Sequence, residues 1–176
     1  MSEVLEFYPA LERPDLLAPT VAEALRGWTR AEQVRVAEID PSLSDTAAFC
    51  AAYGVADTES ANCVVVAGRR GGETSYAACM VTAITRADVN GLVRRRLGAR
   101  KASFAPVEYV TEATGMEYGG ITPLGLPSGW QVFVDAAVAK LDSAVIGSGI
   151  RGSKLWLSGA ALAEIPGAEV LDGLGL

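Results

Sequence analysis

The sequence predicts a single α/β domain with a mixed, barrel-like β-sheet surrounded by helices. Three observations predict this class. Segments in which apolar residues recur at helical spacing alternate with short segments typical of strands. Two of the strands are joined by a glycine turn into a hairpin, so the order differs from repeated βαβ units. The 176 residues, 50% of them hydrophobic, suit one domain over residues 1–176 with a full core.

The first third of the chain contains two predicted helices and one strand. Apolar residues recur at helical spacing over residues 17–28, and Thr20 and Glu23 have the spacing of a capping box. Residues 33–39 alternate polar and apolar side chains, as a half-buried strand does. A second helix is predicted over residues 44–53.

The rest of the chain continues the alternation of strands and helices. Residues 63–68 and 74–82 predict a hairpin, because two adjacent glycines lie in the turn between them. Thr85 and Asp88 are predicted to cap a third helix, which Gly98 closes. The later elements are predicted as a helix from about Pro106 to Gly115, strands over 131–135, 143–147 and 153–158, a helix over 159–165 and a strand over 168–171.

The basic residues are concentrated in one part of an acidic chain. The formal net charge is −6, yet residues 61–105 hold eight basic and two acidic residues, a local net charge of +6. Such a patch could meet the phosphates of one end of a nucleic acid, or it could be a solvated helix face and turn.

The content of histidine and cysteine excludes several kinds of active site. The chain has no histidine, so a Ser-His-Asp triad, a Cys-His pair and an HExxH zinc helix cannot form. Three cysteines without a C-x-x-C spacing favour reduced, mostly buried thiols. No apolar run is long enough to cross a bilayer, and the N-terminus lacks the order of a signal peptide, so we expect a cytoplasmic protein without membrane contact.

Residues 116–125, MEYGGITPLG, form the most unusual segment. Paired glycines permit backbone angles that side chains forbid and allow a ligand to approach the main chain closely, and the proline that follows restricts the loop. The segment is therefore predicted to turn the chain sharply or to bind a ligand.

Five segments in a fixed order carry a family resemblance. They are SANCVVVAG (60–68), KASFAPVEYVTEATG (101–115), GGITPLG (119–125), FVDAAV (133–138) and GSGIRGSKLWLS (147–158). In this order they resemble the YbaK/EbsC family of aminoacyl-tRNA editing domains, which are trans-acting relatives of the editing insertion in bacterial prolyl-tRNA synthetase. The resemblance spans roughly residues 33 to 172.

The resemblance implies a mixed, barrel-like α/β fold and hydrolysis of the ester that joins a wrong amino acid to the 3′-terminal adenosine of tRNA. The implied partners are the acceptor end of aminoacyl-tRNA and an aminoacyl-tRNA synthetase, and the implied chemistry uses neither a metal nor an organic cofactor. Absence of histidine is compatible with this chemistry, because an activated ester needs only positioning, oxyanion stabilisation and a water molecule.

The glycine loop supplies most of the expected site. Gly119, Gly120, Ile121 and Thr122 are assigned to the substrate loop, with N–H groups directed at the ester carbonyl, and Pro123 is expected to fix the shape of the loop. The alternative is a purely structural turn.

Other matched residues are assigned to the substrate pocket, each with a structural alternative. Ala61 and Cys63 could line a pocket for a small side chain such as that of alanine, serine, threonine or cysteine, or could be plain core. Ser148 and Gly149 match a family segment near the pocket, and a strand-linking turn is the alternative. Asp135 resembles a strand-terminal aspartate of the family, but a helix cap is the preferred interpretation.

Asn62 stands where familiar members of the family carry a functionally important lysine. Its amide can orient an ester or a hydroxyl but cannot neutralise charge. Three accounts remain: Asn62 acts as a neutral orienter, another cation such as Arg69 or Lys101 supplies the charge, or the site only binds. We favour the first.

Four basic residues complete the prediction, and two alternatives to an editing enzyme stay open. Arg69, Arg70, Arg100 and Lys101 are expected to contact tRNA phosphates. A thiol enzyme built on Cys63 is disfavoured, because no histidine is present to generate the thiolate. A noncatalytic module that binds aminoacyl-tRNA, a nucleotide or a partner protein is the second alternative.

Overall fold

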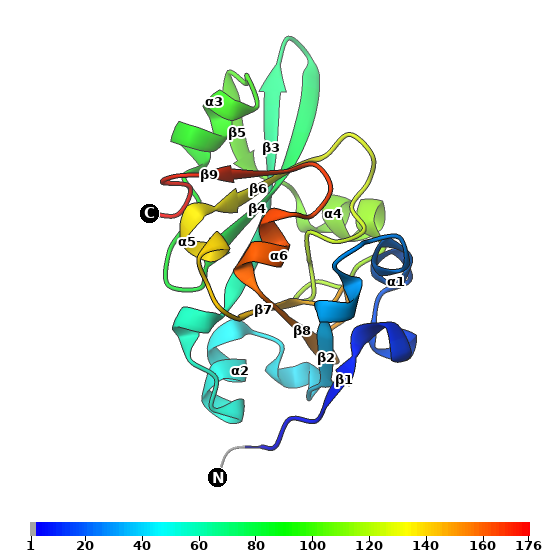
Figure 1. Ribbon diagram of the computed structural model, residues 1–176. Helices are drawn as coiled ribbons and strands as arrows, with labels where there is room; N and C mark the ends of the chain where they lie inside the picture. The colour runs from blue at the N-terminus through cyan, green and yellow to red at the C-terminus, as the bar shows by residue number, and fades with distance from the viewer. Residues whose placement is uncertain (1–2) are drawn as a thin grey trace.

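A computed structural model describes residues 3–176 and shows a mixed α/β domain with two β-sheets (Figure 1). The four-stranded sheet is antiparallel and has the order β1 (Phe7–Pro9), β2 (Arg35–Glu38), β8 (Ser153–Leu157), β7 (Ala144–Gly147). The five-stranded sheet has the order β5 (Lys101–Phe104), β3 (Ala61–Arg70), β4 (Glu73–Thr82), β6 (Gln131–Asp135), β9 (Ala168–Leu171). The α/β class is thus confirmed.

The two sheets meet at the start of β3. A parallel bridge between Ser60 and Val145 joins the beginning of β3 to β7. Within residues 3–176 the strands do not close into a continuous barrel, because the five-stranded sheet ends at β5 and β9, and β9 does not pair with a strand of the other sheet. The barrel-like sheet of the prediction is therefore two adjoining open sheets.

Short helices cover and connect the sheets. The α-helices are α1 (Pro19–Arg26), α2 (Thr46–Tyr53), α3 (Arg94–Arg96), α4 (Val107–Thr114), α5 (Ala136–Ala139) and α6 (Gly159–Ala163). A π-helical turn, η6 (Val89–Val93), precedes α3, and 3-10 turns occur at Ala10–Glu12, Pro14–Leu16, Ala31–Gln33, Pro41–Leu43 and Asp57–Glu59. Figure 1 shows the β3–β4 hairpin projecting away from the four-stranded sheet, with α3 and β5 along one side of it.

The first two helices begin differently from one another. The predicted capping box of α1 is wrong, because Pro19 starts the helix and the N-cap residue, Ala18, offers no side-chain bond. Thr20 lies inside the first turn, and its hydroxyl donates to the carbonyl of Thr114 at 3.3 Å. In α2, Asp45 is the N-cap and accepts hydrogen bonds from the N–H groups of Ala47 and Ala48.

The predicted third helix is partly confirmed. Asp88 caps it by accepting from the N–H groups of Gly91 and Leu92, and Gly98 ends it with a φ of 63°. Thr85 is not a cap, because its hydroxyl donates back to Thr82 at 3.1 Å. The cap bonds of Asp88 lead into the π-helical turn, so only the last residues of the segment are α-helical.

The strands β1 and β5 are absent from the sequence prediction. Each is three or four residues long and lies at a sheet edge, and β1 ends in a proline. Edge strands need no apolar alternation and tolerate proline, so their sequences carry little signal. The strand β5 forms because its backbone pairs with the second half of β3, with Lys101 opposite Arg69 and Phe104 opposite Val66.

The expected cap role of Asp135 is right in position only. Asp135 occupies the N-cap position of α5, yet its side chain makes no cap hydrogen bond. The residue is buried, and its carboxylate lies against the backbone of Gly175 near the end of the described chain. Contact with that terminal segment, which no local pattern indicates, takes the place of the cap.

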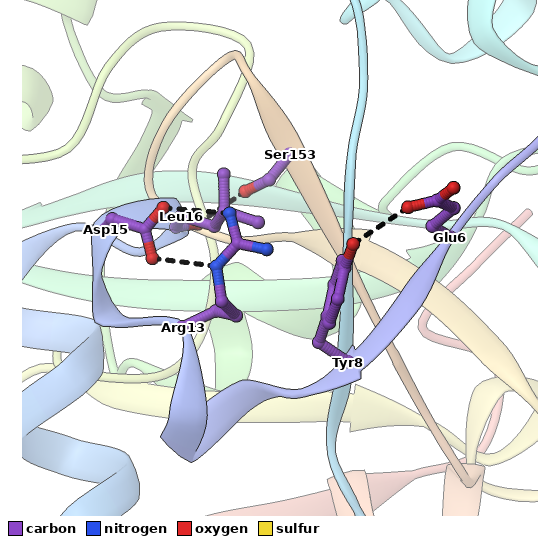
Figure 2. A network of polar contacts seen from close by, with 6 residues as sticks. All are labelled: Glu6, Tyr8, Arg13, Asp15, Leu16 and Ser153. Carbon is purple, nitrogen blue, oxygen red and sulfur yellow. Dashed lines mark hydrogen bonds and ion pairs between the residues drawn. The ribbon is translucent and has the colours of Figure 1, made fainter.

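A hydrogen bond between Ser153 and Leu16 joins the N-terminal segment to β8 of the four-stranded sheet (Figure 2). Tyr8 donates to Glu6 at 2.8 Å, and Arg13 forms an ion pair with Asp15 at 2.9 Å. The hydroxyl of the buried Ser153, the first residue of β8, donates to the carbonyl of Leu16. This bond fixes the start of β8 and hence the residue that follows it, Lys154.

Candidate functional site

A cavity of about 380 Å³ opens where β3, the start of α2, the glycine loop and the strands β7 and β8 meet. The structure brings five of the predicted site residues to it: Ala61, Asn62, Cys63, Gly119 and Ile121. The remaining lining residues are Ser42, Ser44, Asp45, Thr46, Val64, Tyr118, Gly147, Arg151 and Lys154.

Asn62 is held in one orientation by α2. The hydroxyl of Thr46, the first residue of that helix, donates to Asn62 Oδ1 at 2.8 Å. This bond uses the amide oxygen, so the amide NH2 group is directed away from Thr46 and is the donor that Asn62 can offer to a ligand. The side chain is therefore suited to donate to a carbonyl or hydroxyl oxygen in the cavity.

Lys154 supplies the positive charge that Asn62 lacks. It lies on β8 with 7% of its surface exposed, and its Nζ donates to the carbonyl of Ser44 at 2.9 Å. The ammonium group also lies 5.3 Å from the centre of the Phe49 ring. Burial lowers the pKa of Lys154 below its usual value, although the nearby Cys50 and Asp45 oppose that shift.

The two cations considered from the sequence, Arg69 and Lys101, do not reach the cavity. Arg69 and Asn62 lie on the same strand, seven residues apart, which corresponds to roughly 23 Å. Lys101 pairs with Arg69 and lies at the same distant end of β3. Of the basic residues, Lys154 and Arg151 line the cavity, and Lys154 is the buried one.

Gly119 and Gly120 have different roles in the glycine loop. Gly119 lines the cavity with a φ of 92°, and no hydrogen bond to its N–H or to that of Ile121 is found among residues 3–176. The N–H of Gly120 is already donated to the carbonyl of Glu117 at 2.9 Å. The prediction that the N–H of Gly120 donates to the substrate is therefore wrong. Among the described residues, the N–H groups of Gly119 and Ile121 are without a partner.

The end of the glycine loop turns away from the cavity. Thr122 is fully buried, and its hydroxyl is without a hydrogen-bond partner among the described residues. Pro123 lines a separate hollow beside Trp28 and Trp130. Neither residue meets the cavity that holds Asn62, so the structure does not bring Thr122 and Pro123 together with the rest of the predicted site.

Ser148 and Gly149 support the glycine loop from behind. The N–H of Gly149 donates to the carbonyl of Gly120 at 2.7 Å, and its carbonyl accepts from the N–H of Glu117 at 2.9 Å. The buried hydroxyl of Ser148 lies 2.7 Å from that of Ser153 and 3.1 Å from the carbonyl of Ile150. These contacts favour the strand-linking turn over direct contact with a substrate.

Cys63 lines the cavity but is a poor nucleophile. Burial raises the pKa of its thiol, and the neighbouring Cys79 raises it further. Burial also raises the pKa of Cys79 to about 12. Both thiols therefore stay protonated near neutral pH, which argues against thiolate chemistry.

Arg69, Arg70, Arg100 and Lys101 come together where the turn end of β3 pairs with the start of β5. All four side chains are exposed. Arg69 donates to Ser103 at 3.2 Å and Arg70 to the carbonyl of Gly98 at 3.1 Å, so these two are partly ordered. We refer to these four residues as the basic cluster.

Sequence reasoning missed Lys154 and Arg151. Lys154 stands among apolar residues in the strand sequence SKLWL, where a charged residue is unexpected, and that contrast was the available signal. Arg151 is exposed, and its guanidinium donates to the carbonyl of Pro41, with the closer contact at 3.3 Å. Its role carried no local signal, because the partner lies 110 residues away in sequence.

Within the described part of the chain, none of the helices combines the length and the apolar character needed to traverse a lipid bilayer.

Comparisons with known proteins agree with this architecture. The family model described as "Aminoacyl-tRNA editing domain" matches residues 40–165. The fold is similar to that of the hypothetical protein APE2540, with a TM-score of 0.77 and 22% identity, covering 89% of this chain and 99% of that one. It is also similar to that of a proposed trans-editing enzyme for prolyl tRNA synthetase, with a TM-score of 0.73 and 24% identity, covering 88% of this chain and 94% of that one.

A more distant similarity is to a proposed signal transduction protein from Marinobacter aquaeolei VT8, with a TM-score of 0.59 and 17% identity. The match covers 89% of this chain and 30% of that one. The family match spans most of the chain and includes the glycine loop and every residue that lines the cavity, whereas β1, β2 and β9 lie outside it. The protein therefore belongs to the aminoacyl-tRNA editing domain family.

Proposed function

We propose that the protein is a trans-acting aminoacyl-tRNA deacylase, which hydrolyses the ester of a mischarged small amino acid on tRNA. One observation carries the proposal: a single cavity is lined by the buried ammonium group of Lys154, the amide of Asn62 and the loop residues Gly119 and Ile121, whose N–H groups are available. Family membership and the similarity to a proposed trans-editing enzyme support the same activity.

In the proposed reaction a water molecule attacks the ester carbonyl carbon, and negative charge develops on the carbonyl oxygen. N–H donors and a nearby cation stabilise that charge. The bond between the carbonyl carbon and the ribose oxygen then breaks, and one proton of the water is transferred to that oxygen, which gives the free ribose hydroxyl and the free amino acid. Lys154 supplies charge, while Asn62 and the loop N–H groups hold the ester in place.

The walls of the cavity favour a small amino acid. Ala61, Cys63, Gly119 and Gly147 contribute short side chains or none. Alanine, serine, threonine and cysteine are the candidate guests by size. A synthetase pocket excludes such smaller or isosteric amino acids poorly, and a second hydrolytic site corrects the error.

The proposal is tested by deacylation of a panel of mischarged tRNAs that carry small amino acids. Wild-type protein is expected to accelerate the loss of one ester, and Asn62→Ala to reduce kcat/KM about 10- to 100-fold, because one positioned donor is removed. Asn90→Ala, at an exposed asparagine of η6, is the matched control and should retain full activity. Slower hydrolysis than in buffer alone would instead identify a noncatalytic module that binds and protects aminoacyl-tRNA.

The basic cluster is proposed to contact the phosphates of the tRNA acceptor end. Reversing the charges of Arg100 and Lys101 together is expected to weaken tRNA binding and to reduce the salt slope of the binding constant by about 1.4, as for two lost phosphate contacts on a single strand. The measurement is the tRNA affinity at several salt concentrations.

The matched control for charge reversal is the pair Arg26→Glu and Arg35→Glu, which lie exposed on α1 and β2. This double variant has the same change in net charge but lies outside the basic cluster. Equal salt slopes in the two double variants would remove Arg100 and Lys101 from the tRNA contact surface.

A further inference from the structure

A second cavity, of about 270 Å³, adjoins the first one. The two cavities share Cys63, Val64, Tyr118 and Ile121. Apart from Tyr118 and the hydroxyl of Thr111, the lining of the second cavity is apolar. It comes from β3, the end of β5, one face of α4 and the glycine loop. We refer to it as the apolar cavity.

Two aromatic side chains stand exposed in the lining of the apolar cavity. Phe104 is 62% exposed and Tyr118 is 65% exposed, whereas Val65 and Val110 are buried. Phe104 ends β5, the edge strand of the five-stranded sheet, so no further strand covers it. Exposed aromatic rings beside an apolar hollow are suited to a flat ligand that inserts or stacks.

The apolar cavity lies between the basic cluster and the first cavity. The strand β5 starts at Lys101, opposite Arg69 in the basic cluster, and ends at Phe104, opposite Val66. Continuing along β3 toward its start leads past Val65 to Asn62 in the first cavity. A ligand that follows β3 therefore meets positive charge, then an apolar hollow with aromatic rings, then the polar ester site.

We propose that the apolar cavity binds the terminal nucleobase of an RNA 3′ end. The inference rests on the proposed deacylase function and adds the position of the base. The order of the surfaces matches the order of groups in such a ligand: phosphates, terminal base and the ester on its ribose. Stacking on aromatic side chains is a common means of holding an unpaired base.

The amino acid side chain is the competing occupant of the apolar cavity. Because Tyr118 and Ile121 line both cavities, an amino acid side chain could enter the apolar cavity from the first one. The base is favoured because the apolar cavity extends to an exposed edge strand next to positive charge, where the RNA chain has to pass. An enclosed side-chain pocket would need neither an exposed Phe104 nor continuity with the basic cluster.

The test uses the full chain and two probes without an attached amino acid, a CCA trinucleotide and the same trinucleotide with an abasic terminal ribose. The wild type is expected to bind CCA about 5- to 150-fold more tightly than the abasic probe, the effect of one base stack. Phe104→Ala should abolish most of that difference, and Phe104→Trp should restore it. Val170→Ala, at an exposed apolar position on the opposite edge strand β9, should leave the difference unchanged.

Three outcomes would overturn the inference: equal binding of the two probes, no binding of either probe, or a Phe104→Ala variant that keeps the wild-type difference. If Phe104→Ala keeps the difference between the two probes but changes which amino acid is hydrolysed, the apolar cavity holds the amino acid side chain. Because these probes carry no aminoacyl ester, the deacylase proposal is tested separately, by the deacylation assay. Base-dependent binding without any deacylation would contradict the proposed function and would still support the base-binding site.

Discussion

Lys154→Met is expected to reduce single-turnover deacylation by about a hundredfold or more. Lys154 is the buried cation of the cavity, and loss of one charge-stabilising donor at an oxyanion site typically costs that much. Methionine keeps the length and apolar stem of lysine and removes only the charge and the hydrogen bond to the carbonyl of Ser44. Rates are measured on the tRNA that wild type deacylates best.

The effect of Lys154→Met on stability should be small. Replacing a buried charge by an apolar group is favourable, while leaving the carbonyl of Ser44 unpaired costs about 1–3 kcal/mol, so the two effects oppose each other. Lys140→Met, at an exposed lysine after α5, is the matched control. Full activity of Lys154→Met with a normal melting temperature would remove Lys154 from the mechanism.

The same residue predicts a pH dependence with a definite sign. Burial lowers the pKa of Lys154, so the folded protein loses this proton at a lower pH than the unfolded chain does. Activity that depends on the ammonium group should fall as the pH rises through the lowered pKa. Between that value and the usual pKa of lysine the unfolded chain binds more protons, so the contribution of Lys154 to stability increases with pH in this window.

Gly120→Ala is expected to destabilise the protein by about 1–3 kcal/mol, the usual cost of overpacking, and to lower deacylation about a hundredfold. A β-carbon at this position would lie 2.6 Å from the carbonyl oxygen of Ile150 and 2.8 Å from its backbone nitrogen. These are backbone atoms and cannot rotate away, so the glycine loop has to move. Gly119 and Ile121 would then lose their position at the cavity.

The matched control for Gly120→Ala is Gly27→Ala. Gly27 has a negative φ, and a β-carbon there would meet nothing within 4 Å. Thermal unfolding and single-turnover rates are measured for both variants. If Gly120→Ala and Gly27→Ala had the same melting temperature and the same deacylation rate, the close approach of residues 117–121 to residues 147–150 would not matter for stability or activity.

Local patterns were sufficient for most of the secondary structure. The alternation in residues 33–39 predicts β2, the paired glycines predict the β3–β4 hairpin, and Gly115 ends α4 with a φ of 69°. These features depend on neighbouring residues in the chain, because strand period, positive φ and turn chemistry are local properties. The five ordered segments also indicated the family.

The contents of the cavity depended on tertiary structure. Asn62 and Lys154 are roughly 90 residues apart in sequence and line the same cavity only because β3 meets β7, and β7 pairs with β8 with Gly147 opposite Lys154. Likewise, Gly120 bonds within its own loop while Gly119 faces the cavity, although the two look alike in sequence.

The sequence by itself therefore determined the α/β class, the family and the segments that form the site. Only the tertiary structure decided which residues of those segments face the cavity and that its buried cation, Lys154, comes from β8. The physical reason is that strand period and turn chemistry are set by adjacent residues, whereas burial, hydrogen-bond partners and charge in a cavity are set by the register between strands that are distant in the chain.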